Sequence, residues 1–169
     1  SLTINWIDDN LPAILEAWYP GQSGGSAIAE VLFGEYNPGG RLPVTFYKDL
    51  NDLPPLGDYD ITNGLTYMYF KGDVLYPFGH GLSYTTFEYS DITLSSDTIL
   101  AGEDLTISID VTNSGNMDGK EVVQVYLSDD IATVSPDRKK LSRFSKILLK
   151  EGETKTVTFV LTENDLSFV

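Results

Sequence analysis

The second half of the chain alternates apolar and polar residues with a period of two, and this alternation restricts the fold more than any other feature. The clearest example is residues 104–113, in which Ile107, Ile109 and Val111 fall on one face of an extended segment. The other segments of this kind are residues 87–95, 121–128, 140–149 and 154–162. Short strands at even spacing, with turn residues and no helix between them, predict an antiparallel β-sandwich.

This predicted sandwich is short of strands. Beyond the five segments above, we expect a sixth strand to begin at residues 166–169. A seven-stranded sandwich takes about 100 residues, whereas 169 − 86 leaves only 83 residues after residue 86. We therefore expect residues 86–169 to form a β-sandwich that is truncated at its C-terminal end.

Residues 1–46 follow a different pattern. Apolar residues 13–18 predict a strand covered on both faces, residues 26–33 carry apolar side chains at helical spacing, and residues 42–46 predict a second strand. A βαβ unit of this size is close to the limit of about 40 residues below which chains rarely fold alone. We therefore expect an α+β chain whose first unit needs a partner to cover its apolar faces.

Residues 47–85 form a long connector rich in Asp, Gly, Pro and Tyr, in which residues 66–70 predict one short strand. Loops without structure beyond roughly 12–15 residues are uncommon inside compact domains. We therefore expect the connector to pack against a neighbour. Its end overlaps the stretch LYPFGHGLSYTTFEYS, residues 75–90, which places the single histidine, His80, among glycines and aromatic residues.

The overall charge excludes several classes of partner. Eleven basic residues against 25 acidic ones give a net charge of −14, which repels phosphate backbones and anionic lipid headgroups, so we expect no nucleic-acid or membrane partner. The absence of cysteine excludes disulfides and thiolate chemistry. No apolar run approaches the roughly 18 residues that span a bilayer, and a signal peptide, if the protein is exported, lies outside this sequence.

Acidic residues occur in close pairs, which invites a search for acid–base catalysis. The pairs are Asp8 and Asp9, Asp58 and Asp60, Asp129 and Asp130, and Glu151 and Glu153. Hydrolysis of a glycosidic bond needs two carboxyls that face each other across roughly 5–10 Å, and neighbouring acids in loops do not supply this. We interpret most of them as solvated turn residues. Asp58 and Asp60 are a partial exception, because they lie among aromatic residues and could reach a sugar hydroxyl.

His80 and Ser83 together suggest hydrolase chemistry, but no nucleophile elbow G-x-S-x-G accompanies them. We interpret His80 as a packed connector residue. The stretch GQSGG lacks the Lys-Ser/Thr ending of a phosphate-binding loop, and no calcium-loop pattern occurs. The motifs therefore predict no metal-binding or cofactor-binding residue.

Two groups of residues have alternative interpretations. A basic group is interpreted as a solvated loop and strand face, with docking to an acidic neighbour as the alternative. Its members are Arg138, Lys139, Lys140, Arg143, Lys146 and Lys150. Trp6, Trp18 and Tyr19 could stack on a sugar ring, or they could be core residues of the first unit.

The order of several long motifs resembles one known family. The motifs are AILEAWYPGQSGGSAIAEVLFGEYNPGGRLPVTF, TYMYF, LYPFGHGLSYTTFEYS, DVTNSGNMDGKEVVQVYLSD and KILLKEGETKTVTFVL. In this order they resemble the C-terminal region of glycoside hydrolase family 3, the β-glucosidases and β-xylosidases, from about residue 4 to residue 169. INWIDDNLPAILEAWYPGQ and GLTYMYF look closer to the β-xylosidase members.

The resemblance implies a division of the chain. In that family a (β/α)₈-type barrel carries an aspartate nucleophile, an α/β sandwich domain carries a glutamate acid/base, and a fibronectin type III-like domain follows. Residues 1–46 resemble the end of the α/β domain, residues 47–85 the link, and residues 86–169 most of the last domain. The aromatics of the link are then expected to wedge the two domains together.

The same resemblance assigns no catalytic residue to this chain, because the nucleophile and acid/base motifs lie outside the region that it covers. The leading hypothesis is a C-terminal fragment, itself inactive, of a retaining, exo-acting β-glycosidase that needs no cofactor and acts on β-linked saccharides or aryl glycosides. One alternative is a free-standing β-sandwich for binding or adhesion. Another is an assembly module that forms homo-oligomers by strand exchange.

Overall fold

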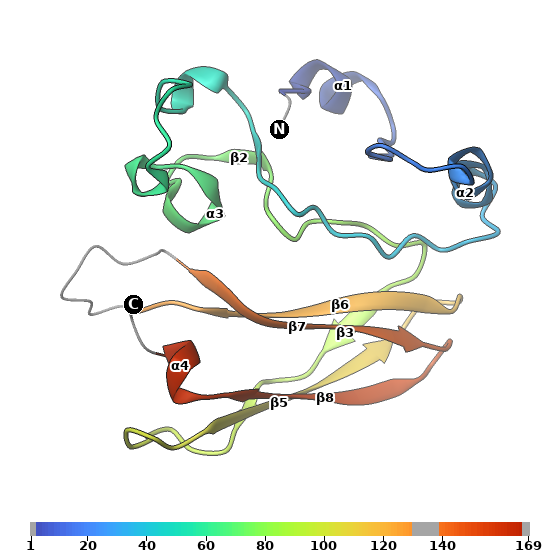
Figure 1. Cartoon of the computed structure of the whole chain (residues 1–169). Coiled ribbons are helices and arrows are strands. Elements are labelled where there is room, and N and C mark those ends of the chain that lie inside the picture. Colours follow the sequence, from blue (N-terminus) through green and yellow to red (C-terminus); the bar gives the residue numbers. More distant parts are fainter. Residues whose placement is uncertain (1–2, 130–138, 167–169) are drawn as a thin grey trace. The chain divides into compact units, whose positions relative to one another are not determined.

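The computed structural model describes residues 3–129 and 139–166, and its contacts divide the chain into two units (Figure 1). The first unit consists mainly of residues 3–36 and 40–82. The second unit consists mainly of residues 37–39, 83–127 and 141–166. The short segment 37–39 therefore belongs with the second unit, although the residues on either side of it belong with the first.

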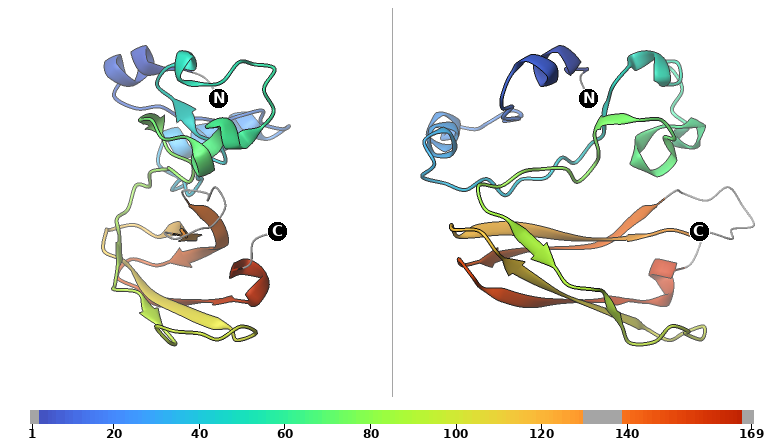
Figure 2. Two further views of the ribbon diagram at one scale, coloured as in Figure 1. Left: turned by 90° about the vertical axis from the view of Figure 1, so that its left-hand side faces the viewer. Right: turned by 180° about the vertical axis from the view of Figure 1, so that it is seen from behind.

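The second unit is a sandwich of two antiparallel sheets, which appear as two layers in Figure 2. One sheet contains β3 (Phe87–Tyr89), β4 (Thr93–Leu94), β5 (Leu105–Asn113) and β8 (Thr154–Leu161). The other contains β6 (Gly119–Leu127) and β7 (Lys140–Leu149), and α4 (Glu163–Leu166) follows β8. The predicted α+β class, with an antiparallel β-sandwich in the second part of the chain, is confirmed.

Alternation places the core as the sequence predicts. Val111 of β5 is fully buried, Ile107 is nearly so, and Ile109 packs against the same core. The opposite face of β5 is polar and forms hydrogen-bonded pairs with β8, among them Ser108 with Thr158 at 3.1 Å. Apolar side chains inward and hydroxyls outward are the pattern expected for a sheet with one covered face.

The segment 87–95, predicted as one strand, is interrupted. Tyr89 pairs with Val111 of β5, whereas Thr93 pairs with Ser108, so three residues between these pairs on one side oppose two on β5. This extra residue is a β-bulge, which breaks the ladder and separates β3 from β4.

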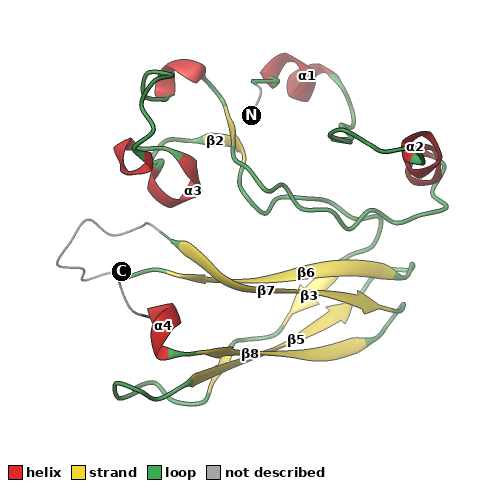
Figure 3. Ribbon diagram, in the orientation of Figure 1, coloured by secondary structure: helices red, strands yellow, loops and turns green. Residues whose placement is uncertain are grey.

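The first unit consists of short elements joined by long loops (Figure 3). They are α1 (Asn5–Asn10), α2 (Gly24–Leu32), β1 (Phe46–Tyr47), η1 (Leu50–Asp52), η2 (Ile61–Asn63), α3 (Thr66–Tyr69) and β2 (Val74–Tyr76). The predicted helix at 26–33 is confirmed as α2. The antiparallel pair β1 and β2 is the sheet of this unit among the described residues.

Several predicted strands in this unit are wrong. Residues 13–18 are loop, because no described strand pairs with them, and a strand exists only through hydrogen bonds to a neighbour. Of the predicted strand 42–46, only Phe46 lies in β1. Of the predicted strand 66–70, residues Thr66–Tyr69 form α3 instead, and the N–H of the following Phe70 bonds the Thr66 carbonyl at 3.0 Å, which closes one helical turn.

The predicted sixth strand at 166–169 is not found in the part that the structure describes. Leu166 ends α4, and residues 167–169 lie outside the described range. The Asp165 carboxylate accepts hydrogen bonds from the Thr162 N–H and hydroxyl, at 2.8 and 2.9 Å, and so favours a helical turn. Among the described residues, no helix has the length and apolar character needed to cross a membrane.

Candidate functional site

A buried polar cluster marks the place where the chain enters the sandwich. Its centre is Asn37, which is 8% exposed. Asn37 Nδ2 donates to the Asp118 carbonyl at 3.0 Å, and Asn37 Oδ1 accepts from the Ser83 hydroxyl and the Tyr84 N–H, both at 2.8 Å. One amide side chain therefore joins three segments of the second unit.

Asn113 forms a second buried amide in the same unit. It is 0% exposed, and its Oδ1 accepts from the Thr85 hydroxyl at 2.6 Å and from the Gly115 N–H at 3.2 Å. Its Nδ2 donates to the carbonyls of Met117 at 2.8 Å and Leu149 at 3.2 Å. Because its donors and acceptors are satisfied, this buried amide fixes the local backbone rather than destabilising it.

Glycines allow this cluster to close. A Cβ on Gly119 would lie 2.6 Å from Thr85 Cγ2 and 2.9 Å from Asn37 Nδ2. A Cβ on Gly115 would lie 2.2 Å from the Thr85 hydroxyl oxygen. We name Asn37, Ser83, Thr85, Asn113 and their two glycines the polar junction. The sequence did not single out this cluster, because buried asparagines have no sequence signature of their own.

His80 and Ser83 do not act as a pair. The Ser83 hydroxyl is engaged by Asn37, whereas the His80 ring stacks on Tyr76 with ring centroids 5.0 Å apart. The Tyr76 hydroxyl donates a hydrogen bond to the Asp8 carboxylate, and this hydrogen bond, with some burial, raises the pKa of Tyr76 to about 12. The structural interpretation of His80 fits this packing.

The aromatic residues of the link contact their own units. Phe78 stacks on Tyr67 at 4.2 Å and Tyr76 meets Phe46 at 6.2 Å, all within the first unit. Phe87 packs against the core of the sandwich. The expected wedging of two domains by these aromatics remains a prediction.

Asp58 and Asp60 shape their own loop. Asp58 accepts from the Asp60 N–H at 2.9 Å and from the Asn63 side chain at 2.8 Å. Asp60 accepts from the hydroxyl and N–H of Thr62, and these hydrogen bonds hold the pKa of Asp60 below its ordinary value. Both carboxyls are thus engaged in capping and turn formation.

The other predicted acidic pairs lie in separate surface elements. Asp8 and Asp9 are exposed on α1, and Asp129 is exposed while Asp130 lies outside the described residues. Glu151 and Glu153 lie in the turn before β8. Glu153 accepts from the Lys150 N–H, which lowers the pKa of Glu153, and its carboxylate lies 3.3 Å from the Lys155 ammonium.

A buried carboxyl that the sequence did not single out lies in the sandwich. Glu121 of β6 is 7% exposed and accepts a hydrogen bond from the Tyr89 hydroxyl of β3 at 2.9 Å. These strands belong to different sheets, so the contact crosses the sandwich.

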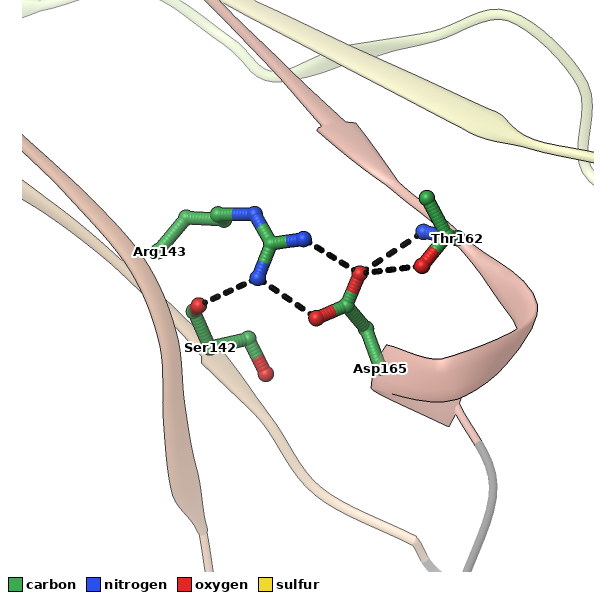
Figure 4. A network of polar contacts seen from close by, with 4 residues as sticks. All are labelled: Ser142, Arg143, Thr162 and Asp165. Atoms are coloured by element: carbon green, nitrogen blue, oxygen red, sulfur yellow. Dashed lines mark hydrogen bonds and ion pairs between the residues drawn. The ribbon is translucent and has the colours of Figure 1, made fainter.

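Arg143 stands apart from the rest of the predicted basic group. Its guanidinium donates hydrogen bonds from both Nη atoms to the Asp165 carboxylate, each at 2.5 Å, and Nη1 also donates to the Ser142 carbonyl at 2.9 Å (Figure 4). The Thr162 N–H and Arg143 together hold the pKa of Asp165 below its ordinary value. Lys140 and Lys146 are exposed on β7, and Arg138 lies outside the described residues.

The three aromatic residues considered for sugar stacking are exposed: Trp6 is 70% exposed, Trp18 50% and Tyr19 100%. The core interpretation is therefore wrong for this structure. Trp18 also adopts a left-handed φ of 51°, and its N–H bonds the Glu16 carboxylate at 2.9 Å. No group of three or more His, Asp or Glu side chains within residues 3–129 and 139–166 could hold a metal ion.

Comparison with known proteins finds two family models that match parts of the chain. Residues 1–84 match the family model of the glycosyl hydrolase family 3 C-terminal domain, and residues 121–169 match that of the fibronectin type III-like domain. A beta-xylosidase of Formosa agariphila is 43% identical over 172 residues, which cover 99% of this chain and 24% of that protein. A periplasmic beta-glucosidase of Salmonella typhimurium is 45% identical, covering 95% of this chain and 22% of that protein.

Solved structures agree with this result. Beta-glucosidase 3B of Thermotoga neapolitana superposes with a TM-score of 0.85 at 35% identity, covering 97% of this chain and 24% of that one. A β-glucosidase of Erythrobacter marinus gives a TM-score of 0.82 at 41% identity, covering 94% and 21%. The chain thus spans about a quarter or less of the length of these relatives.

Proposed function

This chain belongs to glycoside hydrolase family 3, in the C-terminal region of its longer members, and we propose that the complete protein is a retaining, exo-acting β-glycosidase. It releases glucose or xylose from β-linked oligosaccharides or aryl glycosides. The reaction proceeds by double displacement through a glycosyl-aspartate intermediate, without a cofactor. The chain's similarity to proteins named beta-xylosidase and beta-glucosidase supports this proposal.

In this proposal the chain supplies no catalytic carboxyl. A general acid in glycoside hydrolysis needs a raised pKa so that it stays protonated at working pH. Where hydrogen bonding and charge clearly shift a described carboxyl, at Asp60, Glu153 and Asp165, the pKa is lowered. These three acids stay ionised and serve caps, turns and an ion pair.

The role proposed for the chain is structural, and the polar junction is the observation that carries it. Asn37 comes from the segment that matches the family 3 C-terminal domain, yet its side chain is bonded entirely within the sandwich unit. The junction therefore makes the sandwich depend on a residue of the preceding domain. We propose domain boundaries at residues 1–46, 47–85 and 86–169, with Asn37 reaching across them.

Activity assays test whether the catalytic residues lie outside this chain. The purified 169-residue chain is expected to show no turnover of aryl β-glucosides or aryl β-xylosides, whereas the full-length protein hydrolyses at least one of them. Turnover by the chain alone, at a rate that scales with its concentration and survives repeated purification, would contradict the proposal.

The alternatives from the sequence make different predictions. A free-standing binding module would occur without an upstream barrel, which the full gene sequence decides. Strand exchange would give a homo-oligomer, which light scattering of the purified chain detects. The net charge of −14 supports the absence of nucleic-acid and membrane partners.

A further inference from the structure

The first unit contains an open hollow of about 690 Å³ that no motif of the sequence indicated. It lies between the segment that follows β1, the helix η2 and the residues around the end of α3. Its lining combines apolar surface with the polar side chains of Lys48, Asp52, Asn63, Tyr69, Lys71 and Asp73. Sites for small ligands usually have volumes of about 300–1,000 Å³, so a small molecule fits this space.

The lining is balanced in charge and rich in hydrogen-bonding groups. Lys48 and Lys71 are matched by Asp52 and Asp73, and the Lys48 ammonium lies 3.8 Å from the Asp73 carboxylate. A phosphate would meet two carboxylates in a chain that already carries −14, and an apolar ligand would cover charged groups without pairing them. A neutral ligand with several hydroxyls can both donate to these carboxylates and accept from the ammonium groups.

An aromatic floor completes the lining. Tyr69 lines the hollow and is half-buried. Phe70 also lines it, but it is 7% exposed and packs against Tyr47 with ring centroids 4.9 Å apart. Aromatic surface beside hydrogen-bonding groups suits a sugar, whose ring carries both C–H and O–H groups.

Backbone strain shapes the loop that lines the hollow. Thr66 is β-branched yet has a φ of 60°, in the left-handed region, and nearby Gly64 has a φ of 94°. The Thr66 N–H donates to the buried Tyr47 hydroxyl at 2.9 Å, which holds this conformation. Strained residues of this kind persist where the surroundings impose them, and they concentrate at ligand sites.

We propose that this hollow binds a neutral sugar, with Lys71 and Asn63 donating to its hydroxyls and Tyr69 packing against its ring. The site goes beyond the proposed hydrolase activity and does not depend on it. Either a free monosaccharide or the end of a saccharide chain supplies the required chemistry.

The test is a titration of the ¹⁵N-labelled chain followed by NMR chemical shifts. Xylose and glucose represent the free sugar, and the corresponding β-1,4-linked disaccharides represent a chain end. Saturable shifts confined to residues 62–64 and 69–73 are expected. Whichever binds more tightly, the monosaccharide or the disaccharide, shows whether the site takes a free sugar or the end of a saccharide chain. Glycerol and inorganic phosphate serve as comparison ligands.

Variants make the result specific. Lys71→Ala is expected to weaken binding by about threefold to tenfold, the size of one lost charged hydrogen bond at an exposed position. Lys146→Ala, a matched exposed lysine on β7, is expected to change nothing. Thr66→Gly relieves the strained φ and is expected to weaken binding while the sandwich spectrum stays the same.

Four outcomes would overturn the proposal: no saturable shifts at these residues, equal shifts with glycerol, binding of phosphate in preference to sugar, or loss of binding in Lys146→Ala. Because activity is not the readout, failure here leaves the hydrolase proposal standing.

Discussion

Asn37 is bonded through both polar atoms of its side chain within the second unit. If this amide is removed, each of its partners is left without a hydrogen bond, and an unsatisfied buried polar group lowers the stability of the fold. The residue therefore contributes more to stability than its single side chain suggests.

Replacing Asn37 with Ala leaves the Ser83 hydroxyl, the Tyr84 N–H and the Asp118 carbonyl without their partner. We expect the free energy of unfolding of the sandwich to fall by about 2–3 kcal/mol. Urea unfolding followed by circular dichroism measures this. Asn116→Ala, at an exposed position of the same unit, is the control and is expected to stay within about 0.5 kcal/mol of the wild type.

Gly119 tests the packing of the polar junction. Gly119→Ala places a Cβ 2.6 Å from Thr85 Cγ2, so we expect a loss of about 1–3 kcal/mol from overpacking. Thr85→Ser removes that methyl and keeps the hydroxyl, so the double variant is expected to recover part of the loss. Gly115→Ala clashes with the retained hydroxyl oxygen and is expected to gain nothing from Thr85→Ser. Purely additive losses at Gly119 would contradict this packing.

The strands of the sandwich illustrate what alternation does at the scale of an element. Leu149 of β7 is 0% exposed, while its neighbour Leu148 is 49% exposed. Successive side chains of a strand point to opposite faces, so two identical residues in sequence have different environments.

This difference predicts unequal effects for the same substitution. Leu149→Ala creates a cavity in the core and is expected to cost about 2–5 kcal/mol. Leu148→Ala is expected to cost much less, because half of its surface is already in water. Thermal or urea unfolding of the two variants compares them directly, and similar losses would mean that the register of β7 is wrong.

The ion pair between Asp165 and Arg143 holds α4 against β7. The folded pKa of Asp165 lies below that of an unfolded Asp, near 3.9. The pair therefore contributes stability that is fully present above about pH 5 and is lost as the pH falls through the folded pKa.

Asp165→Asn is accordingly expected to destabilise the sandwich at pH 7, and the difference from the wild type is expected to shrink toward pH 3. Unfolding midpoints at pH 7, 5 and 3 measure this. Asp97→Asn, at an exposed position, is the control with no such trend. A difference that stays constant with pH would show that the substitution acts through packing and not through charge.

In the whole molecule, the two units are not continuous stretches of sequence. Residues 37–39 complete a sandwich that otherwise begins at Ser83. A Cβ on Gly39 would lie 2.8 Å from the Lys120 carbonyl, so the backbone of this segment also contacts β6 closely. A sandwich cut out by sequence position alone lacks this piece.

We therefore expect a chain that begins at Ser83 to be less stable than the same residues within the 169-residue chain. The Tyr84 N–H loses its acceptor on Asn37, so its amide hydrogen should exchange faster with solvent. Hydrogen exchange measured by NMR compares the two chains. Equal protection of Tyr84 in both would mean that Asn37 does not anchor the sandwich.

The sequence by itself determined the strands β5 to β8 and the helix α2. Each of these elements buries one face, so its apolar residues recur at a regular spacing in the sequence. The order of its motifs also indicated the family. One local signal was overlooked: Thr162 followed by Asp165 is a capping pattern that predicts α4.

Only the tertiary structure decided the rest. Asn37 bonds a residue 81 positions away, Thr66 takes its left-handed conformation where the Tyr47 hydroxyl accepts its N–H, and residues 13–18 stay without a described strand partner. In each case the outcome depends on which distant group is at hydrogen-bonding distance. Such partners leave no periodic pattern in the sequence, because a single buried polar contact constrains one position and not a run of residues.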